Sequence, residues 1–198
     1  MEATEGIVLK SLDYKENQRI ITVFSKDFGV ISLIVKGVSR SSLQKLAITT
    51  PLCQAEFHFT RGKSDLFRLS ECAVVCDHLP LRNQLSHLQA AGVMAQAILK
   101  FQLPCKPTPL LYALFERYLK QLPGFPNPLP LTSSFLLKML HLEGLLSLER
   151  PLPHFTSSEQ DLLTTLVESR SFTKVGQQPV TPSFAQKVYD HFTRCMEH

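Results

Sequence analysis

The hydrophobic pattern of this chain changes its period at about residue 80, and this change constrains the fold more than any other feature of the sequence. Before it, five segments are rich in Ile, Val, Phe and Leu, which suit a pleated, half-buried surface. After it, apolar residues recur at helical intervals, as on a helix with one buried face. Strands followed by helices indicate an α+β protein. We therefore expect a strand domain at 1–79 and an α-helical domain at 80–198.

The expected strands share short, apolar runs bounded by turn residues, and they are 5–12, 18–25, 30–37, 51–61 and 65–75. The fourth has the clearest alternation, because Ala55, Phe57 and Phe59 are separated by polar residues. One long connection, at about 38–50, follows the third strand. Five short strands with an interruption at this point favour an oligonucleotide-binding (OB) barrel. The pattern leaves a small SH3-like barrel open as the alternative.

Helical spacing predicts a long helix from about residue 80, followed by shorter ones. Proline-rich stretches at 104–109 and 123–130 separate these helices. The helix at about 132–147 is apolar on nearly all sides, so we expect it to form the buried centre of the helical domain. The other expected helices are at about 109–122, at about 158–169 behind a capping box in Ser157-Ser158-Glu159-Gln160, and after the N-cap Thr181 with Pro182.

The sequence contains few patterns that indicate catalytic or metal-binding groups. Gly62-Lys63-Ser64 resembles the end of a phosphate-binding loop, but Phe57 stands where that motif needs glycine, so a hairpin turn is favoured. Cys72 and Cys76 are interpreted as small core thiols, and the five cysteines as free, mostly buried thiols. The seven histidines lack a metal-ligand spacing. We expect no enzyme, no cofactor and no metal site.

The charge is mildly positive and unevenly distributed. The net charge is +4, and no acidic residue occurs between Asp27 and Glu56. No apolar run approaches the roughly 18 residues of a membrane span, and the first ten residues lack the basic start of a signal peptide, so we expect a cytoplasmic protein. Cations on barrel loops and strands can neutralise phosphates. The candidates are Arg19, Lys36, Arg40, Lys45, Arg61, Lys63 and Arg68, although a solvated basic surface is the simpler interpretation of composition alone.

Several segments resemble the RecO family. In the run 5–40, the shared features are a Gly-Ile-Val-Leu first strand, an acid and an arginine before strand two (Glu16, Arg19), a Ser-Lys-x-x-Gly turn, and Lys36-Gly37 with Arg40 after strand three. Residues 61–75 and 135–147 also look like family segments. One departure is clear. Many RecO proteins carry a four-cysteine zinc module after the buried helix, whereas 147–160 contains no cysteine.

This resemblance implies a recombination mediator of the RecFOR pathway, associated with the nucleoid. Such a protein binds single- and double-stranded DNA, anneals strands coated with single-stranded-DNA-binding protein (SSB), and helps RecR to load RecA. It also binds the acidic C-terminal tail of SSB through its helical domain. Lys36 and Arg40 match basic residues that the family uses for DNA. The alternative is a protein-interaction adaptor that recruits SSB or RecR and binds DNA weakly.

Overall fold

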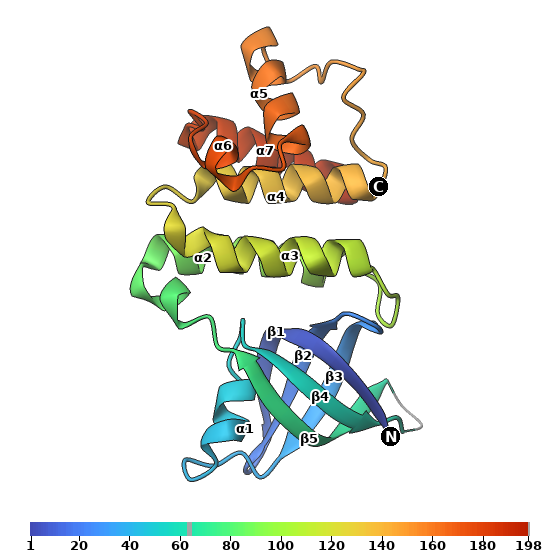
Figure 1. Ribbon diagram of the computed structural model, residues 1–198. Helices are drawn as coiled ribbons and strands as arrows, with labels where there is room; N and C mark the ends of the chain where they lie inside the picture. Colours follow the sequence, from blue (N-terminus) through green and yellow to red (C-terminus); the bar gives the residue numbers. More distant parts are fainter. Residues whose placement is uncertain (63–64, 198) are drawn as a thin grey trace. The chain divides into compact units, whose positions relative to one another are not determined.

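The computed structural model describes residues 1–62 and 65–197, and it begins with a closed barrel (Figure 1). Its neighbouring strands follow the order β1-β2-β3-β5-β4, and only the β3–β5 pair is parallel. A helix, α1, lies between β3 and β4 in the chain. This topology is the OB fold, so the expected barrel is confirmed and the SH3-like alternative is wrong. The elements are β1 Glu2–Lys15, β2 Gln18–Ser25, β3 Gly29–Lys36, α1 Leu43–Ile48, β4 Gln54–Thr60 and β5 Leu66–Cys76.

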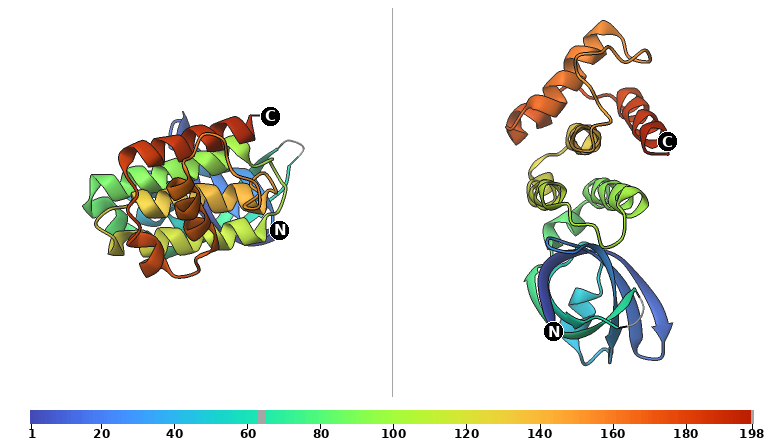
Figure 2. Two further views of the ribbon diagram at one scale, coloured as in Figure 1. Left: turned by 90° about the horizontal axis from the view of Figure 1, so that it is seen from above. Right: turned by 90° about the vertical axis from the view of Figure 1, so that its right-hand side faces the viewer.

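Alternating side chains fill the barrel, whose strands curve round a common interior (Figure 2, right). Phe57 and Phe59 are fully buried, as their alternation predicts. Phe59 stacks on Phe67, with ring centroids 5.5 Å apart. Phe28 contacts Phe59 edge-on, also with 5.5 Å between the ring centroids. Burial of each such ring contributes about 1.5–3 kcal/mol. Apolar contacts of this kind therefore stabilise the barrel.

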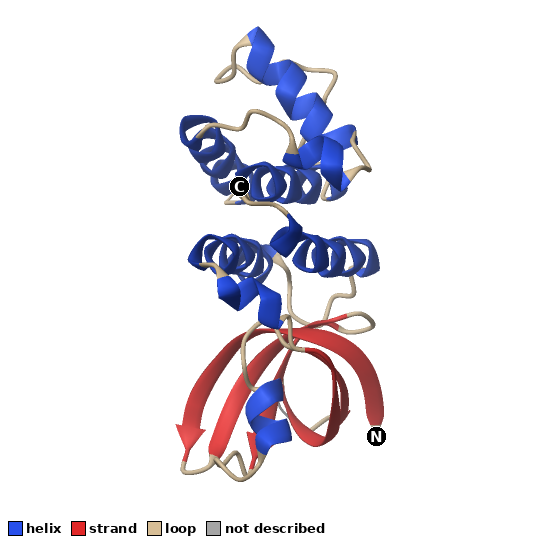
Figure 3. Ribbon diagram, turned by 60° about the vertical axis from the view of Figure 1, so that its left-hand side comes forward, coloured by secondary structure: helices blue, strands red, loops and turns tan. Residues whose placement is uncertain are grey.

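The long connection after β3 contains a structure that the sequence analysis did not predict. Helix α1 forms there and lies beside the strands (Figure 3). The side-chain amide of Gln44 donates to the carbonyl of Cys72 on β5. Cys72 packs partly against the core, but Cys76 does not belong to the core cluster, and only Cys53 among the five cysteines is buried. The expectation of mostly buried thiols was therefore wrong.

The chain forms two compact units. The first unit joins residues 1–79 to Ile98–Glu116, and the second joins Pro80–Ala97 to the chain from Arg117 onward. In the first unit, Phe24 contacts Tyr112 at 5.7 Å between ring centroids. A separation into independently folding domains at residue 79 stays a prediction.

The rest of the chain is helical, as expected, with short 3-10 helices at η1 and η2. Among the described residues, no helix is long and apolar enough to cross a membrane. The elements are η1 Leu79–Asn83, α2 Leu85–Phe101, α3 Pro109–Gln121, η2 Leu122–Gly124, α4 Leu129–Leu142, α5 Ser157–Glu168, α6 Phe172–Gly176 and α7 Pro182–Met196.

Helix α4 is the buried centre of the second unit, since it contacts α5, α6 and α7. Its bounds differ from the expected 132–147. It begins inside the proline-rich stretch, because Pro130 stands in the first turn, where its missing N–H is not needed. It ends at Leu142, because Gly144 adopts a φ of +73° that a helix cannot continue.

Other local expectations are only partly right. The N-cap of α5 is Thr156, whose side chain accepts from the Glu159 N–H while Glu159 accepts from the Thr156 N–H. Thr181 caps α7 as predicted. Helical spacing also gives Leu85 and Leu110 the pattern of a buried apolar face, but they are 70% and 72% exposed.

Candidate nucleic-acid interface

One end of the barrel is built by the β1–β2 turn and the segment that follows β3. Asn17 occupies the turn with a φ of 54°, a conformation that asparagine tolerates better than most residues. Gln18 pairs with Lys36, and the Val38 N–H donates to the Asn17 carbonyl at 2.9 Å. The β2–β3 hairpin therefore brings residues 15–19 beside residues 36–40. We call this end the turn pole.

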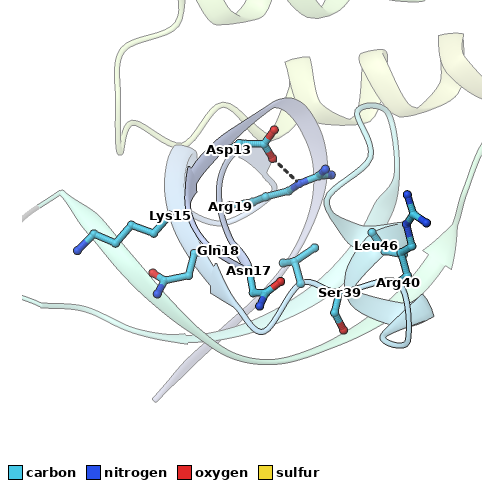
Figure 4. Close-up of a pocket in the computed structure, with 9 residues that line it drawn as sticks. Asp13, Lys15, Asn17, Gln18, Arg19, Ser39, Arg40 and Leu46 are labelled. Atoms are coloured by element: carbon cyan, nitrogen blue, oxygen red, sulfur yellow. Dashed lines mark hydrogen bonds and ion pairs between the residues drawn. The ribbon is translucent and has the colours of Figure 1, made fainter.

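The turn pole carries an open concavity with a volume of about 360 Å³. Lys15 and Arg40 lie on opposite sides of it (Figure 4). Both side chains belong to exposed residues. Such an arrangement suits an extended anion better than a small molecule. The lining residues are Asp13, Lys15, Asn17, Gln18, Arg19, Val38, Ser39, Arg40 and Leu46.

Arg19 is partly neutralised within the concavity. Its Nε donates to Asp13 Oδ1 at 2.9 Å, and its terminal nitrogen donates to the hydroxyl of Thr49 at 3.3 Å. The Arg19 side chain is 34% exposed and that of Asp13 is 87% exposed. Because the pair is close to solvent, it contributes little to stability. Its main effect is to reduce the positive charge that Arg19 presents.

Lys45 has a structural contact at the same pole. Its Nζ donates to the Lys36 carbonyl at 2.7 Å, which links α1 to the end of β3. The side chain of Lys36 is not used in that bond, and Lys36 and Arg40 are both exposed. Phosphate contacts at these two residues would therefore require no rearrangement of the core.

Further cations lie on the outward side of the sheet. Arg68 of β5 is paired with Ile34 of β3, two residues before Lys36, and it is exposed. Lys10 of β1 is exposed and is paired with Thr22. Lys10 and Lys15 were not among the cations predicted from the sequence. The position of Lys15 directly before the β1–β2 turn was the signal that could have found it.

Arg61 lies at the opposite end of the β1–β2 hairpin. Its Nε donates to Glu2 at 2.7 Å, and its guanidinium lies 5.1 Å from the ring centroid of Phe28 and 5.4 Å from that of Phe67. These contacts cover the aromatic cluster of the core. Lys63 lies outside the described residues. Four of the predicted cations thus lie at the turn pole, namely Arg19, Lys36, Arg40 and Lys45. Arg68 lies on the neighbouring sheet face, and Arg61 lies at the opposite end of the β1–β2 hairpin.

These features define an OB-fold protein with a helical second unit and a cationic barrel end. Residues 1–76 match the family model described as "Recombination protein O N terminal". The DNA repair protein RecO of Acetivibrio thermocellus is 34% identical over 142 residues, which are 71% of this chain and 56% of that protein. RecO of Moorella thermoacetica is 33% identical, over 71% of this chain and 52% of that protein.

RecO of Chlamydia trachomatis serovar L2 is 28% identical over 96% of this chain and 77% of that protein. The chain belongs to the RecO family. It matches only about half the length of the Acetivibrio and Moorella proteins.

Proposed function

We propose that this protein is a non-enzymatic, DNA-binding recombination mediator that acts in DNA repair at the nucleoid. Its relatives are named as DNA repair proteins. In this proposal it binds single- and double-stranded DNA in the cytoplasm, anneals complementary strands, and helps RecR to load RecA at gaps coated with SSB.

The observation that carries the proposal is the group of exposed cations at and beside the turn pole. These residues are Lys10, Lys15, Lys36, Arg40 and Arg68. Lysine and arginine that contact phosphates release condensed counterions, which favours binding without reading the base sequence. Annealing requires no covalent step. Cations that contact both strands lower the repulsion between their phosphates, so that the strands can approach and pair.

The test is a fluorescence titration with a labelled oligonucleotide of roughly 20 nucleotides, a length that can span an OB-fold binding site. The variant Lys36→Glu/Arg40→Glu should bind at least about tenfold more weakly and lose the steep dependence on salt between about 50 and 200 mM. The thermal unfolding midpoint should hardly change, because both residues are exposed.

The matched control is Lys26→Glu/Lys106→Glu, which makes the same total change of charge in the same unit. Lys26 lies in the β2–β3 turn, the backbone of Lys106 lies against Gly29, and both lysines are exposed. This control should retain most of the affinity. Equal losses in the two double variants would show a response to net charge alone and would contradict a binding site at the turn pole.

A second candidate function is the adaptor that recruits SSB or RecR, and a cation cluster in the second unit favours it. Lys138 Nζ donates to the Ser169 carbonyl at 2.6 Å, and the guanidinium of Arg117 lies 5.5 Å from the ring centroid of Phe172. Burial lowers the pKa of Lys138, and the charges of Arg117 and Arg170 lower it further. An acidic peptide such as the SSB tail would relieve this repulsion.

Titration with a labelled SSB-tail peptide tests the adaptor function. Arg170→Glu should weaken peptide binding, because it reverses one charge of the cluster. Arg150→Glu is the control, since Arg150 is exposed in the loop between α4 and α5. If the two variants bind the peptide equally well, the cluster is not the anchor.

A further inference from the structure

A row of aliphatic side chains crosses the outside of the barrel. Leu12 of β1 is paired with Ile20 of β2, and Ile20 is paired with Ile34 of β3. The row ends on Arg68 of β5, which is the partner of Ile34. Leu12 is 49% exposed, while Ile20 and Ile34 are partly exposed. We call Leu12, Ile20 and Ile34 the outer row.

The register shows that the outer row does not belong to the barrel interior. The residues next to Ile20 and Ile34 along their strands, Ile21 and Leu33, are fully buried in the core. Side chains alternate between the two faces of a strand, so Ile20 and Ile34 must point outward. An outward face normally carries polar residues. Three neighbouring aliphatic residues on such a face form an apolar strip that is available to a binding partner.

An exposed aromatic residue follows the outer row along β1. Tyr14 lies two residues beyond Leu12, at the register irregularity between Asp13 and Lys15, and is also 49% exposed. The Nζ of Lys15 lies 5.4 Å from the centroid of the Tyr14 ring. The partly exposed ring therefore has a positive charge beside it, and an exposed ring and a cation are the two components of a base-stacking site for single strands.

Charge around the outer row decides between possible occupants. Lys36 is two residues from Ile34 on β3, and Lys10 is two residues from Leu12 on β1. Both are exposed, as is Arg68 at the end of the row. An apolar strip bordered by cations matches a single strand of nucleic acid, in which flat bases are accessible and phosphates lie at their sides. A duplex hides its base faces and offers mainly phosphates.

We propose that the outer row and Tyr14 form a platform for the bases of single-stranded nucleic acid, and that this platform makes the barrel prefer single strands to duplexes. The inference rests on the proposed function, because it assumes that the cations beside the row contact phosphates. It adds a base-contacting surface to a site that would otherwise recognise charge alone. Bases held there remain separated from one another and ready to meet a complementary strand.

The experiment compares three labelled probes of equal length: an oligothymidylate, an abasic strand with the same phosphates, and a duplex. The wild-type protein should bind the oligothymidylate about tenfold more tightly than the abasic strand, as expected for one or more stacked bases. The variant Leu12→Ala/Tyr14→Ala should lose this preference, while its affinities for the abasic strand and the duplex stay unchanged. Tyr14→Phe should keep the preference, since it retains the ring.

Leu110→Ala is the control for the removal of an exposed apolar side chain, because Leu110 is 72% exposed in the same unit. The platform is refuted if Leu12→Ala/Tyr14→Ala keeps the wild-type preference, if the wild-type protein has none, or if the variant loses affinity for all three probes equally. A face that binds a protein instead would give the first of these results. Failure of the proposed function looks different: Lys36→Glu/Arg40→Glu would then bind the abasic strand as well as wild type does.

Discussion

The Asp13–Arg19 pair offers a test in which DNA binding should become stronger. Asp13→Asn keeps the size of the side chain but removes the negative charge 2.9 Å from Arg19 Nε. If Arg19 lies within the DNA footprint, it then becomes one additional full cation for the phosphates. Asp13 is 87% exposed, so the cost in folding free energy should stay below about 1 kcal/mol.

The size of the gain follows from counterion release. One more contact with a single strand makes the slope of log affinity against log salt steeper by about 0.7. If the contact contributes nothing beyond ion release, the affinity should rise about fivefold at 0.1 M salt and about threefold at 0.2 M, and the gain should vanish near 1 M. Fluorescence titrations of a labelled single strand at several salt concentrations would measure both the gain and the slope.

The matched control is Glu2→Gln, because Glu2 neutralises Arg61 in the same way at the other end of the barrel, with a distance of 2.7 Å. A footprint at the turn pole predicts a gain for Asp13→Asn and none for Glu2→Gln. Equal gains in the two variants would mean that the affinity for DNA depends only on the net charge of the protein. No gain for Asp13→Asn at low salt would remove Arg19 from the footprint and refute the reasoning.

Three further predictions concern the second unit. Hydrogen bonds from Lys187 and from the Thr156 N–H hold the pKa of Glu159 below its usual value. Its contribution to stability is therefore present at neutral pH and is lost as the pH falls through the lowered pKa. Glu159→Gln should make the free energy of unfolding, measured by urea denaturation, depend less on pH in the acidic range. Ser134→Ala should destabilise the second unit by about 1–3 kcal/mol, because the buried Ser134 hydroxyl forms hydrogen bonds with both the Tyr118 hydroxyl and a backbone carbonyl. The loss should exceed that of Tyr118→Phe, and equal midpoints of thermal unfolding for the two variants would contradict this ranking. Elemental analysis of purified protein should find no stoichiometric zinc, since the segment after α4 lacks cysteine, and one zinc per chain would show that this interpretation is wrong.

Helix α4 shows which features the local apolar pattern predicts correctly and which it does not. Its all-round apolar composition predicted burial correctly, because a helix without a polar face must be covered on every side. Its ends were misplaced, because proline was treated only as a helix breaker. In the first turn proline is tolerated, and the positive φ of Gly144 ends the helix earlier than the leucines suggested.

The cationic site was less predictable than the fold. Lys36 and Arg40 were chosen because they resemble family residues, and both are exposed at the turn pole. Arg61 was chosen from its charge and its turn, but it contacts Glu2 and two aromatic rings. Sequence spacing does not reveal such partners, because Glu2 and Arg61 meet only when β1 and β4 pair.

The sequence by itself determined that five strands precede the long helices and which residues of β4 enter the core, since these depend on periodicities within a few residues. Tertiary structure alone decided that Lys15 and Arg40 line one concavity and that Leu12, Ile20 and Ile34 form one outward row. The reason is physical. Side-chain alternation is a local property of each strand, whereas neighbours across strands depend on register, which is fixed only when the whole barrel closes.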